Sequence, residues 1–439
     1  MKILTINCGS SSLKYLLFDA DAGRRVASGI VERVTVGGSF IKHKVVPPDG
    51  GEPATVKRDY ECPTHKEAID LVLTTLTAGE GKVIGDTREI AAVAHRVVHG
   101  GEELTGSVRV DEHVLDVLRR CISLAPLHNP PNIAGIEAAR AALPDARHVV
   151  IFDTAFHYTL PPAAFLYALP YKWYKDYGIR RYGFHGTSHL YVSRRAAALL
   201  GKDPRDLNAV TFHIGNGSSA CAVKGGVSVD TSMGFTPLEG LVMGTRSGDI
   251  DPAIPFHLMG KLDLITDEAY SFLNKQSGVL GITGKFADRR DVEAAYRADA
   301  AKDDAGADEP GSAYRCKLAF EVECYRLRKY LGAYLAVLGR ADAVVFTAGV
   351  GENWPALRAQ TLAGMEPSGI ILDREKNEGL ARGEEGNIAA ATSPIRVLVI
   401  PTDEERVFVE DTVALANGTY DLPDKFVYSF QKPAYKRRY

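Results

Sequence analysis

The chain has 439 residues, of which 45% are hydrophobic and 24% are charged, and its formal net charge is −3. This length suits two or three domains that each bury a hydrophobic core, and the composition is that of an ordinary globular protein. A charge so close to zero gives no reason to expect a nucleic acid or a membrane surface as a partner.

The chain contains six cysteines, without a C-x-x-C pair or the spacing of a zinc site. Such cysteines are typical of reduced, structural thiols in a cytosolic protein. The N-terminus enters an apolar strand at once, and no apolar run approaches the length of a membrane span. We therefore expect a cytoplasmic protein, in which the basic tail from Lys425 to Tyr439 is solvated and has no role.

Strand-like and helical runs alternate along the chain, which is typical of an α/β architecture. The predicted strands are residues 90–95, 147–152, 209–214, 343–347 and 395–400. The predicted helices are residues 64–77, 111–124, 190–200, 314–338 and 404–416. Residues 297–312 are expected to form a polar surface loop.

Two segments repeat one pattern, in which a turn rich in glycine, asparagine and serine joins two apolar runs. The first turn is Asn-Cys-Gly-Ser-Ser-Ser at 7–12, and the second is Gly-Asn-Gly-Ser-Ser at 215–219. Glycine lets the backbone approach an oxyanion, to which N–H groups and serine hydroxyls donate. One such turn is ordinary hairpin chemistry, but two copies predict a duplicated unit whose halves face one phosphate group.

Two arginines lie in glycine-rich loops, where scaffolds display reactive groups. Arg96 ends an apolar strand before Gly100-Gly101, and Arg246 lies between Gly244 and Gly248. The planar guanidinium fork suits carboxylate and phosphate oxygens. The alternative is that each arginine pairs with a structural acid. The occurrence of both in glycine-rich turns leaves the two interpretations about equally weighted.

Asp153 follows an apolar strand, where it could orient an arginine or hold metal-bound water; the alternative is a helix N-cap. His185 and His189 are spaced for one helix face, but the glutamate that follows the first histidine in zinc proteases is missing. His185, between glycines, is best placed to donate to an oxyanion. Other histidines, such as His157, are expected to be structural.

The C-terminal third adds two further signals. Residues 343–353 run from a strand into a turn with Gly349 and Gly351, which could present flat backbone to a nucleotide. Adjacent acids, among them Asp403 and Glu404, precede a helix, where they complement its dipole or bind Mg²⁺. Together with the two turns and the two arginines, these signals predict phosphoryl transfer. Neither a Walker A motif nor a protein-kinase signature is present.

These segments closely resemble the acetate kinase family. The resemblance is carried in order by residues 7–14, 95–101, 125–132, 152–157, 182–189, 213–219, 236–248, 346–353 and 400–405. It implies the two-lobed, duplicated ribonuclease H-like fold of sugar kinases, the Hsp70 ATPase and actin, with the active site in the interdomain cleft. It further implies one lobe of residues 1–153 plus 404–439 and a second of residues 154–403. The implied activity is reversible formation of acetyl phosphate and ADP from acetate and ATP, with Mg²⁺ or Mn²⁺, in a homodimer.

The resemblance also implies a role for each matching residue. The catalytic residues would be Arg96, Asp153, His185 and Arg246. The acetate site would comprise Arg96, Val98, Leu127, His128, Phe184, Pro237 and Arg246. The nucleotide and its phosphates would contact Asn7, Ser10, Ser12, Lys14, His213, Asn216, Gly217, Gly349, Gly351 and Asn353. The metal would lie near Asn7 and Glu404.

The sequence departs from the family pattern at Cys8, where alanine is frequent, and at Asp403, where asparagine is frequent. Asp403 adds negative charge beside Glu404. The open Gly349–Gly351 turn favours ATP over pyrophosphate as the phosphoryl donor. The alternatives are a propionate or butyrate kinase of the same family and, more remotely, a non-catalytic ATP-binding module of the same fold.

Overall fold

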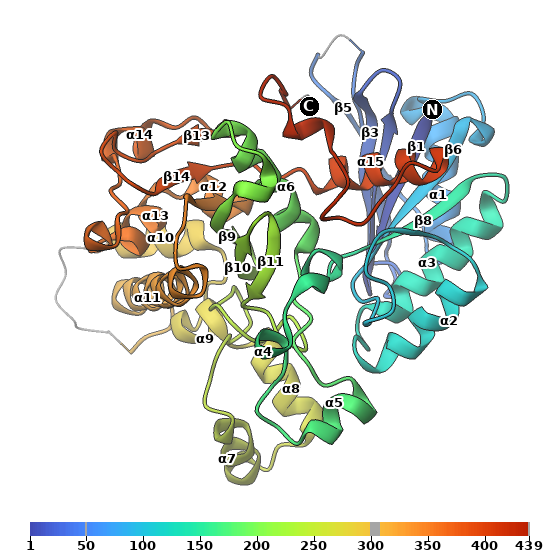
Figure 1. Cartoon of the computed structure of the whole chain (residues 1–439). Helices are drawn as coiled ribbons and strands as arrows, with labels where there is room; N and C mark the ends of the chain where they lie inside the picture. Colours follow the sequence, from blue (N-terminus) through green and yellow to red (C-terminus); the bar gives the residue numbers. More distant parts are fainter. Residues whose placement is uncertain (49–50, 299–307, 438–439) are drawn as a thin grey trace. The chain divides into compact units, whose positions relative to one another are not determined.

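The computed structural model describes residues 1–48, 51–298 and 308–437 (Figure 1). The chain forms two compact units. Unit 1 comprises Met1–Tyr158 and Asp403–Tyr439, and unit 2 comprises Thr159–Thr402. Each unit is built on its own mixed sheet, as an α/β architecture requires.

The sheet of unit 1 has eight strands in the order β5-β4-β3-β2-β1-β6-β8-β7. β1 pairs antiparallel with β2 and parallel with β6, which in turn pairs parallel with β8. The strands are β1 (Lys2–Cys8), β2 (Ser12–Asp19), β3 (Arg24–Glu32), β4 (Phe40–Val45), β5 (Ala54–Asp59), β6 (Ile90–Val97), β7 (Val108–Arg109) and β8 (Arg147–Phe152).

Helices cover both faces of this sheet because its central strands are apolar on both sides. Leu4 and Ile6 of β1 pack into a core with α1 (His65–Thr77) and α3 (Asn129–Ala142). Ile3, which points to the opposite face, packs with Phe408 and Val409 of α15 (Glu404–Asn417). A third cluster joins β8 to α2 (Glu112–Arg120) and α3.

The C-terminal tail packs against its own unit, contrary to the expectation that it is solvated. Tyr428 and Phe430 are 1% and 0% exposed, and their rings stack with centroids 4.8 Å apart. Arg406 of α15 donates to Ser429 Oγ over 3.0 Å. The basic composition of the tail drew attention away from Tyr428 and Phe430, which hold it in place. Lys432 and Lys436 are exposed, as expected.

The sheet of unit 2 has six strands in the order β11-β10-β9-β12-β14-β13. They are β9 (Asn208–Ile214), β10 (Ser218–Lys224), β11 (Val227–Thr231), β12 (Ala343–Thr347), β13 (Gly386–Asn387) and β14 (Arg396–Val399). Strand for strand, this order repeats β3-β2-β1-β6-β8-β7 of unit 1, with the same hairpin and the same parallel neighbours. The predicted duplication is confirmed.

The unit 2 sheet also lies between helices. Val210, Phe212 and Ile214 of β9 pack with α11 (Ala313–Leu338) and α13 (Pro355–Leu362). The alternate residues Thr211 and His213 bond to α6 (Gly186–Leu199) on the other face. The other helices are α4 (Pro162–Phe165), α5 (Tyr171–Tyr177), α7 (Ala253–Leu262), α8 (Thr266–Lys275), α9 (Gly278–Thr283), α10 (Arg289–Ala298), α12 (Ala348–Asn353) and α14 (Arg374–Gly379).

Several predicted boundaries differ from those observed. The predicted helix at 111–124 ends at Arg120 and is followed by a 3-10 turn over Cys121–Ser123. α6 begins at Gly186 rather than at residue 190, because His185 adopts left-handed backbone with φ 56° and starts the helix there. The predicted loop at 297–312 begins inside α10, and its centre at 299–307 lies outside the described residues. Within the described ranges, every helix is too short or too polar to cross a membrane.

Candidate active site

The first glycine turn joins β1 to β2 in unit 1. Gly9 N–H donates to Ser12 O over 2.8 Å, and Asn7 and Lys14 lie opposite each other in the hairpin register. Ser10 and Lys14 are exposed, while Asn7 and Ser12 are half-buried. By strand alternation, Asn7 and Lys14 share the sheet face that carries α15. The predicted phosphate contacts of unit 1 therefore come together at one end of the hairpin.

Arg96 and Asp153 lie at the carboxyl ends of β6 and β8, next to this turn. Because Ala94 and Ile151 pack on the α15 face, alternation carries Arg96 and Asp153 to that face as well. Arg96 Nε and Nη2 donate to the two Asp153 carboxylate oxygens over 2.8 and 2.6 Å. The Asp153 side chain is 5% exposed and that of Arg96 is 25% exposed, so the guanidinium keeps an open side.

Charge around Arg96 holds it firmly in the protonated form. Burial alone would lower the pKa of Arg96, but the Asp153 carboxylate and, more weakly, Glu404 raise that pKa above its ordinary value. Glu404, the first residue of α15, therefore interacts electrostatically with Arg96. Two of the five guanidinium N–H donors serve Asp153, which leaves three for another oxyanion.

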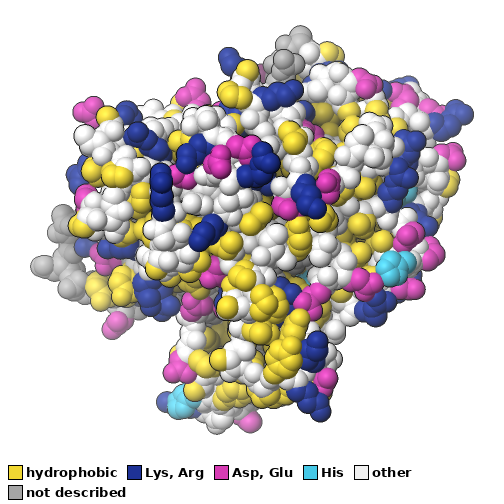
Figure 2. Space-filling model, viewed as in Figure 1, with side chains coloured by type: hydrophobic (Ala, Val, Ile, Leu, Met, Phe, Trp, Pro, Cys, Tyr) yellow, Lys and Arg dark blue, Asp and Glu magenta, His cyan; other side chains and the backbone are white. Residues whose placement is uncertain are grey.

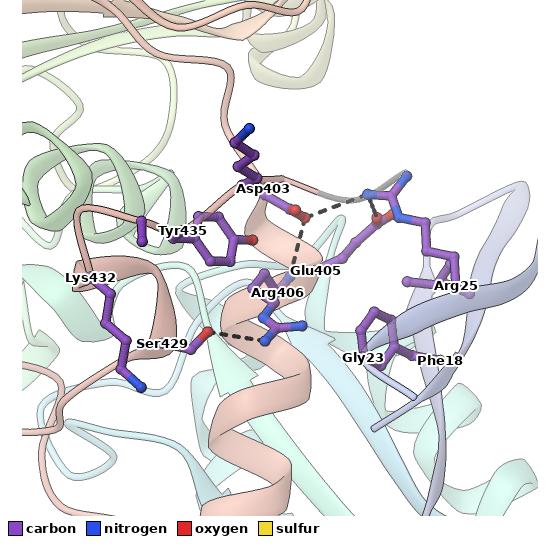
Figure 3. A pocket seen from close by; sticks show the side chains of 12 residues that line it. Phe18, Gly23, Arg25, Asp403, Glu405, Arg406, Ser429, Lys432 and Tyr435 are labelled. Carbon is purple, nitrogen blue, oxygen red and sulfur yellow. Dashed lines mark hydrogen bonds and ion pairs between the residues drawn. The ribbon is translucent and has the colours of Figure 1, made fainter. Parts of the chain in front are cut away.

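Asp403 caps α15 and is the centre of a cluster of charges (Figure 3). Its carboxylate is 8% exposed and lies 3.4 Å from Arg25 Nη2 and 3.5 Å from Arg437 Nε. Arg25 also reaches Glu405 over 2.8 Å. These two arginines offset the charge that Asp403 adds beside Glu404. The cluster lines a cavity of about 430 Å³ between the β2–β3 turn, the start of α15 and the tail.

The predicted acetate pocket draws on both units. In unit 1, Val98 is half-buried with its N–H donated to Asn132 Oδ1 over 3.2 Å, whereas Leu127 is 51% exposed. His128 is half-buried at the N-terminal end of α3. In unit 2, Phe184 is 2% exposed and Pro237 is half-buried. That these side chains form one pocket stays a prediction, because neither unit contains all of them.

In unit 2 the second glycine turn lies beside two of the predicted catalytic residues. A methyl group placed on Gly217 would lie 3.4 Å from His185 Nε2 and 3.5 Å from Arg246 Nη1. Arg246 is oriented by Pro237 O, to which its Nη1 donates over 3.1 Å. Burial lowers the pKa of Arg246 from its ordinary value. Glycine at 217 thus leaves a space that both a cation and an imidazole border.

The histidines predicted for this region form one group in unit 2. The rings of His185 and His213 stack with centroids 4.1 Å apart, and His213 Nδ1 lies 2.8 Å from Ser188 Oγ. His189 is 0% exposed and bonded on both ring nitrogens to hydroxyl groups. Both ring nitrogens of His189 are thus used in hydrogen bonds within unit 2.

The predicted third glycine turn, Gly349–Gly351, lies in the short helix α12 rather than in a turn, and it borders a cavity of about 790 Å³ within unit 2. Its lining includes Gly215, Asn216, Gly349, Val350 and Asn353, so it joins the second and third turns. A methyl group on Gly349 would meet nothing within 4 Å, as expected for backbone left open to a ligand. Ala348, which precedes it, has φ 64°, a strained conformation that concentrates at functional sites.

The cavity also contains charged residues that the sequence pattern did not single out. They are Asp288, Arg289, Arg290, Glu293, Arg358 and Arg382. Arg289 forms a buried pair with Glu323, with Arg289 Nη2 and Glu323 Oε1 2.8 Å apart. Arg358, 1% exposed, donates to Gly351 O and Glu352 O over 2.9 Å and so braces the third turn. No sequence motif marked these residues.

The residues proposed for Mg²⁺ have the chemistry that this ion requires. Asn7 and Glu404 supply an amide oxygen and a carboxylate, the hard oxygen donors that Mg²⁺ prefers. Across the described ranges no group of three or more His, Cys, Asp or Glu side chains could hold a metal. A site with few protein ligands suits an ion that keeps water and substrate phosphate oxygens in its shell.

A duplicated α/β fold, with a glycine turn opening each sheet and arginine beside each turn, defines a phosphotransferase. Comparison with known proteins gives the family. Residues 2–410 match the acetokinase family, and the chain belongs to it. An acetate kinase of Geobacter metallireducens is 59% identical over 440 residues, which cover 100% of both chains.

Two solved structures have the same fold. The acetate kinase of Porphyromonas gingivalis superposes with a TM-score of 0.87 at 42% identity, covering 94% of this chain and 99% of that one. A propionate kinase of Francisella tularensis superposes with a TM-score of 0.83 at 36% identity, with the same coverage. The predicted family and fold are confirmed.

Proposed function

We propose that this protein transfers the γ-phosphoryl group of ATP to acetate, reversibly, giving acetyl phosphate and ADP. One observation carries the proposal: the chain is 59% identical over its full length to a protein named acetate kinase. The geometry supplies groups that suit the chemistry, since Arg96 keeps unused donors and His185 and Arg246 border one space.

A carboxylate is already a nucleophile, so the reaction needs no general base. Catalysis then rests on positioning two anionic reactants and on neutralising the charge of the in-line transition state. Arg96, oriented by Asp153, binds the acetate carboxylate or the transferring phosphoryl oxygens. Arg246 and His185 donate to the phosphoryl group as it moves. Val98, Leu127, His128, Phe184 and Pro237 enclose the small acid and limit its length.

The nucleotide lies in the 790 Å³ cavity of unit 2, which is lined by Asn216, Gly349 and Asn353. The predicted contacts Gly217 and Gly351 adjoin these lining residues in the chain. Asn7, Ser10, Ser12, Lys14 and His213 bind its phosphates. Asn7 and Glu404 hold Mg²⁺, which when bound neutralises phosphate charge. The active protein is cytoplasmic.

We further propose a homodimer. Support comes from large apolar side chains that unit 2 leaves exposed on α5, α7 and α8. Tyr171, Tyr177, Phe256, Leu262 and Ile265 are between 54% and 75% exposed. Figure 2 shows hydrophobic side chains gathered at the bottom of the view, where Figure 1 has these helices. A contiguous apolar patch is typical of an interface. Sedimentation at micromolar concentration should therefore give twice the monomer mass.

A hydroxamate assay with purified protein, ATP, Mg²⁺ and acetate tests the reaction directly. We expect acetyl phosphate to form in proportion to ADP. Absence of acetyl phosphate, with nucleotide binding intact, would favour the non-catalytic ATP-binding module.

The rival substrate is propionate, which the name of the Francisella tularensis relative suggests. One methylene changes specificity by about 1–3 kcal/mol, so acetate and propionate should differ by about 10-fold to 200-fold in kcat/KM. Measuring kcat/KM for acetate, propionate and butyrate decides between them, and a preference for either longer acid would overturn acetate as the substrate.

A further inference from the structure

His185 is held in an unusual backbone conformation by its place at the start of α6. Its φ of 56° lies in the left-handed region, which is strained for a residue other than glycine. The imidazole Nδ1 lies 2.9 Å from Ser219 Oγ. The other nitrogen, Nε2, is the one that borders Gly217 and Arg246.

Ser219 is the first member of a buried chain of hydrogen bonds behind His185. Its Oγ also lies 2.8 Å from His189 Nε2, and His189 Nδ1 lies 2.7 Å from Thr211 Oγ1. Ser219, His189 and Thr211 are each 0% exposed. No member of the chain can therefore turn to solvent for a substitute partner.

The direction of the protons follows from the far end of this chain. Among the described residues, His189 Nδ1 is the one hydrogen-bond partner of the Thr211 hydroxyl. A buried hydroxyl hydrogen without an acceptor is unfavourable, so Thr211 donates to Nδ1. His189 then carries its own proton on Nε2 and donates it to Ser219 Oγ. Ser219 in turn donates its single hydrogen to His185 Nδ1.

His185 consequently accepts at Nδ1 and carries its proton on Nε2. A cationic His185 would have to donate from Nδ1 as well, and the Ser219 hydroxyl would then receive two donors and lose its own acceptor. The chain therefore opposes the imidazolium form. It also avoids a second positive charge beside Arg246, which burial already disfavours.

We infer that Thr211, His189 and Ser219 form a positioning chain that fixes His185 as the neutral tautomer with its proton on Nε2. In this state His185 donates a hydrogen bond to phosphoryl oxygens without itself adding charge. The three residues are positioning residues, since each acts through His185. The consequence for catalysis rests on the proposed function, whereas the tautomer itself does not.

NMR of protein labelled with ¹⁵N-histidine tests the tautomer without turnover. Long-range ¹H–¹⁵N correlations distinguish the Nε2–H, Nδ1–H and doubly protonated rings, and the His185→Asn variant identifies the His185 signals. We expect the Nε2–H form at neutral pH in protein free of nucleotide and acetate. Either of the other forms would overturn the inference. If the protein proved not to transfer phosphate to acetate, the tautomer of His185 would be unaffected. A different tautomer would equally leave the proposed phosphotransfer intact.

Variants test whether the chain sets the tautomer. In Ser219→Ala and Thr211→Val we expect a mixture of His185 tautomers. We also expect kcat to fall about 10-fold to 100-fold in Ser219→Ala and less in Thr211→Val, with the nucleotide KM within about twofold. Unchanged kcat and an unchanged His185 spectrum in Thr211→Val would refute the chain.

Thr231→Val is the matched control. The Thr231 hydroxyl is also 0% exposed on a strand of the same sheet, but it donates to Ala220 O over 3.0 Å and not to a histidine. This variant should lose stability while keeping the His185 spectrum and kcat. Should Ser219→Ala not fold, Thr211→Val and the wild-type spectrum still decide the matter.

Discussion

Asp153 forms a bidentate ion pair with Arg96, with N···O distances of 2.8 and 2.6 Å. The two residues lie at the ends of neighbouring parallel strands. The carboxylate uses Nε and Nη2 and so fixes the plane of the guanidinium. An arginine held in this way loses little side-chain freedom when it binds another anion.

Asp153→Asn should therefore lower kcat about 100-fold while the nucleotide Kd stays within about twofold. Asparagine has one acceptor oxygen where aspartate has two, so Nε and Nη2 of Arg96 cannot each donate to their own oxygen, and the guanidinium loses its fixed orientation. Steady-state kinetics and calorimetric titration with ADP measure the two quantities. Asp116→Asn, which breaks an exposed pair with Arg119, is the control and should change neither. An equal loss in both quantities would show that Asp153 is merely structural.

Gly244→Ala should weaken nucleotide binding. A methyl group at this position would lie 2.0 Å from Asn216 Oδ1 and 2.9 Å from Arg289 Nη1, so the Asn216 side chain must leave its place in the cavity lining. We expect the ADP Kd to rise about 10-fold, which corresponds to a loss of about 1.4 kcal/mol of binding free energy. In Gly260→Ala the methyl group meets nothing within 4 Å, and the Kd should not change. Equal affinities in the two variants would remove Asn216 from the site.

The buried acid Asp411 should make stability depend on pH. Burial raises the pKa of Asp411 to about 7, although the hydrogen bond from Ser107 lowers it. The Ser107 hydroxyl donates to Asp411 Oδ2 over 2.6 Å. From about pH 4 to about pH 7 the folded protein holds a proton that the unfolded chain has released, so stability falls as pH rises and then levels off.

Across that window the loss amounts to about 4 kcal/mol at most. Asp411→Asn should flatten this part of the pH profile, because the amide does not titrate. Urea unfolding at a series of pH values measures the profile. Asp70→Asn, at an exposed position, should keep the slope of the parent. A slope that survives in Asp411→Asn would assign the effect to another group.

Phe430→Ala should destabilise unit 1 by about 3–5 kcal/mol, because this side chain is 0% exposed and stacks on Tyr428. Val427→Ala is the control from the same segment, since Val427 is 74% exposed and its truncation should cost little. Thermal unfolding followed by calorimetry compares the two. A tail that is merely solvated would give equal, small effects.

Features that are local in sequence could be predicted. Both glycine turns, the strands that flank them and the position of Arg96 follow from short runs of residues, and the pairing of Arg96 with Asp153 follows from parallel strand ends. The spacing of His185 and His189 correctly indicated that the two side chains lie close together, since both rings contact Ser219 Oγ, although His185 precedes α6 and only His189 lies within it.

Features that depend on distant partners could not be predicted. Arg289 and Arg358 line the 790 Å³ cavity of unit 2 through packing of α10, α11 and α13, which no local pattern encodes. Ser219 and Thr211 meet His189 because alternate residues of β9 and β10 face α6. Nothing in the sequence indicated that Arg25 offsets the negative charge of Asp403, because the two residues are 378 positions apart in the chain.

The split composition of unit 1 has a consequence for biosynthesis. Unit 2 is one continuous stretch, Thr159–Thr402, whereas unit 1 needs Asp403–Tyr439 to be complete. Until those last residues leave the ribosome, Ile3, Ala94 and Ile151 lack the helix that covers them. The nascent chain must therefore carry an uncovered apolar sheet face throughout translation, a state open to aggregation and to capture by chaperones. β1 therefore emerges well before α15, the helix that covers it.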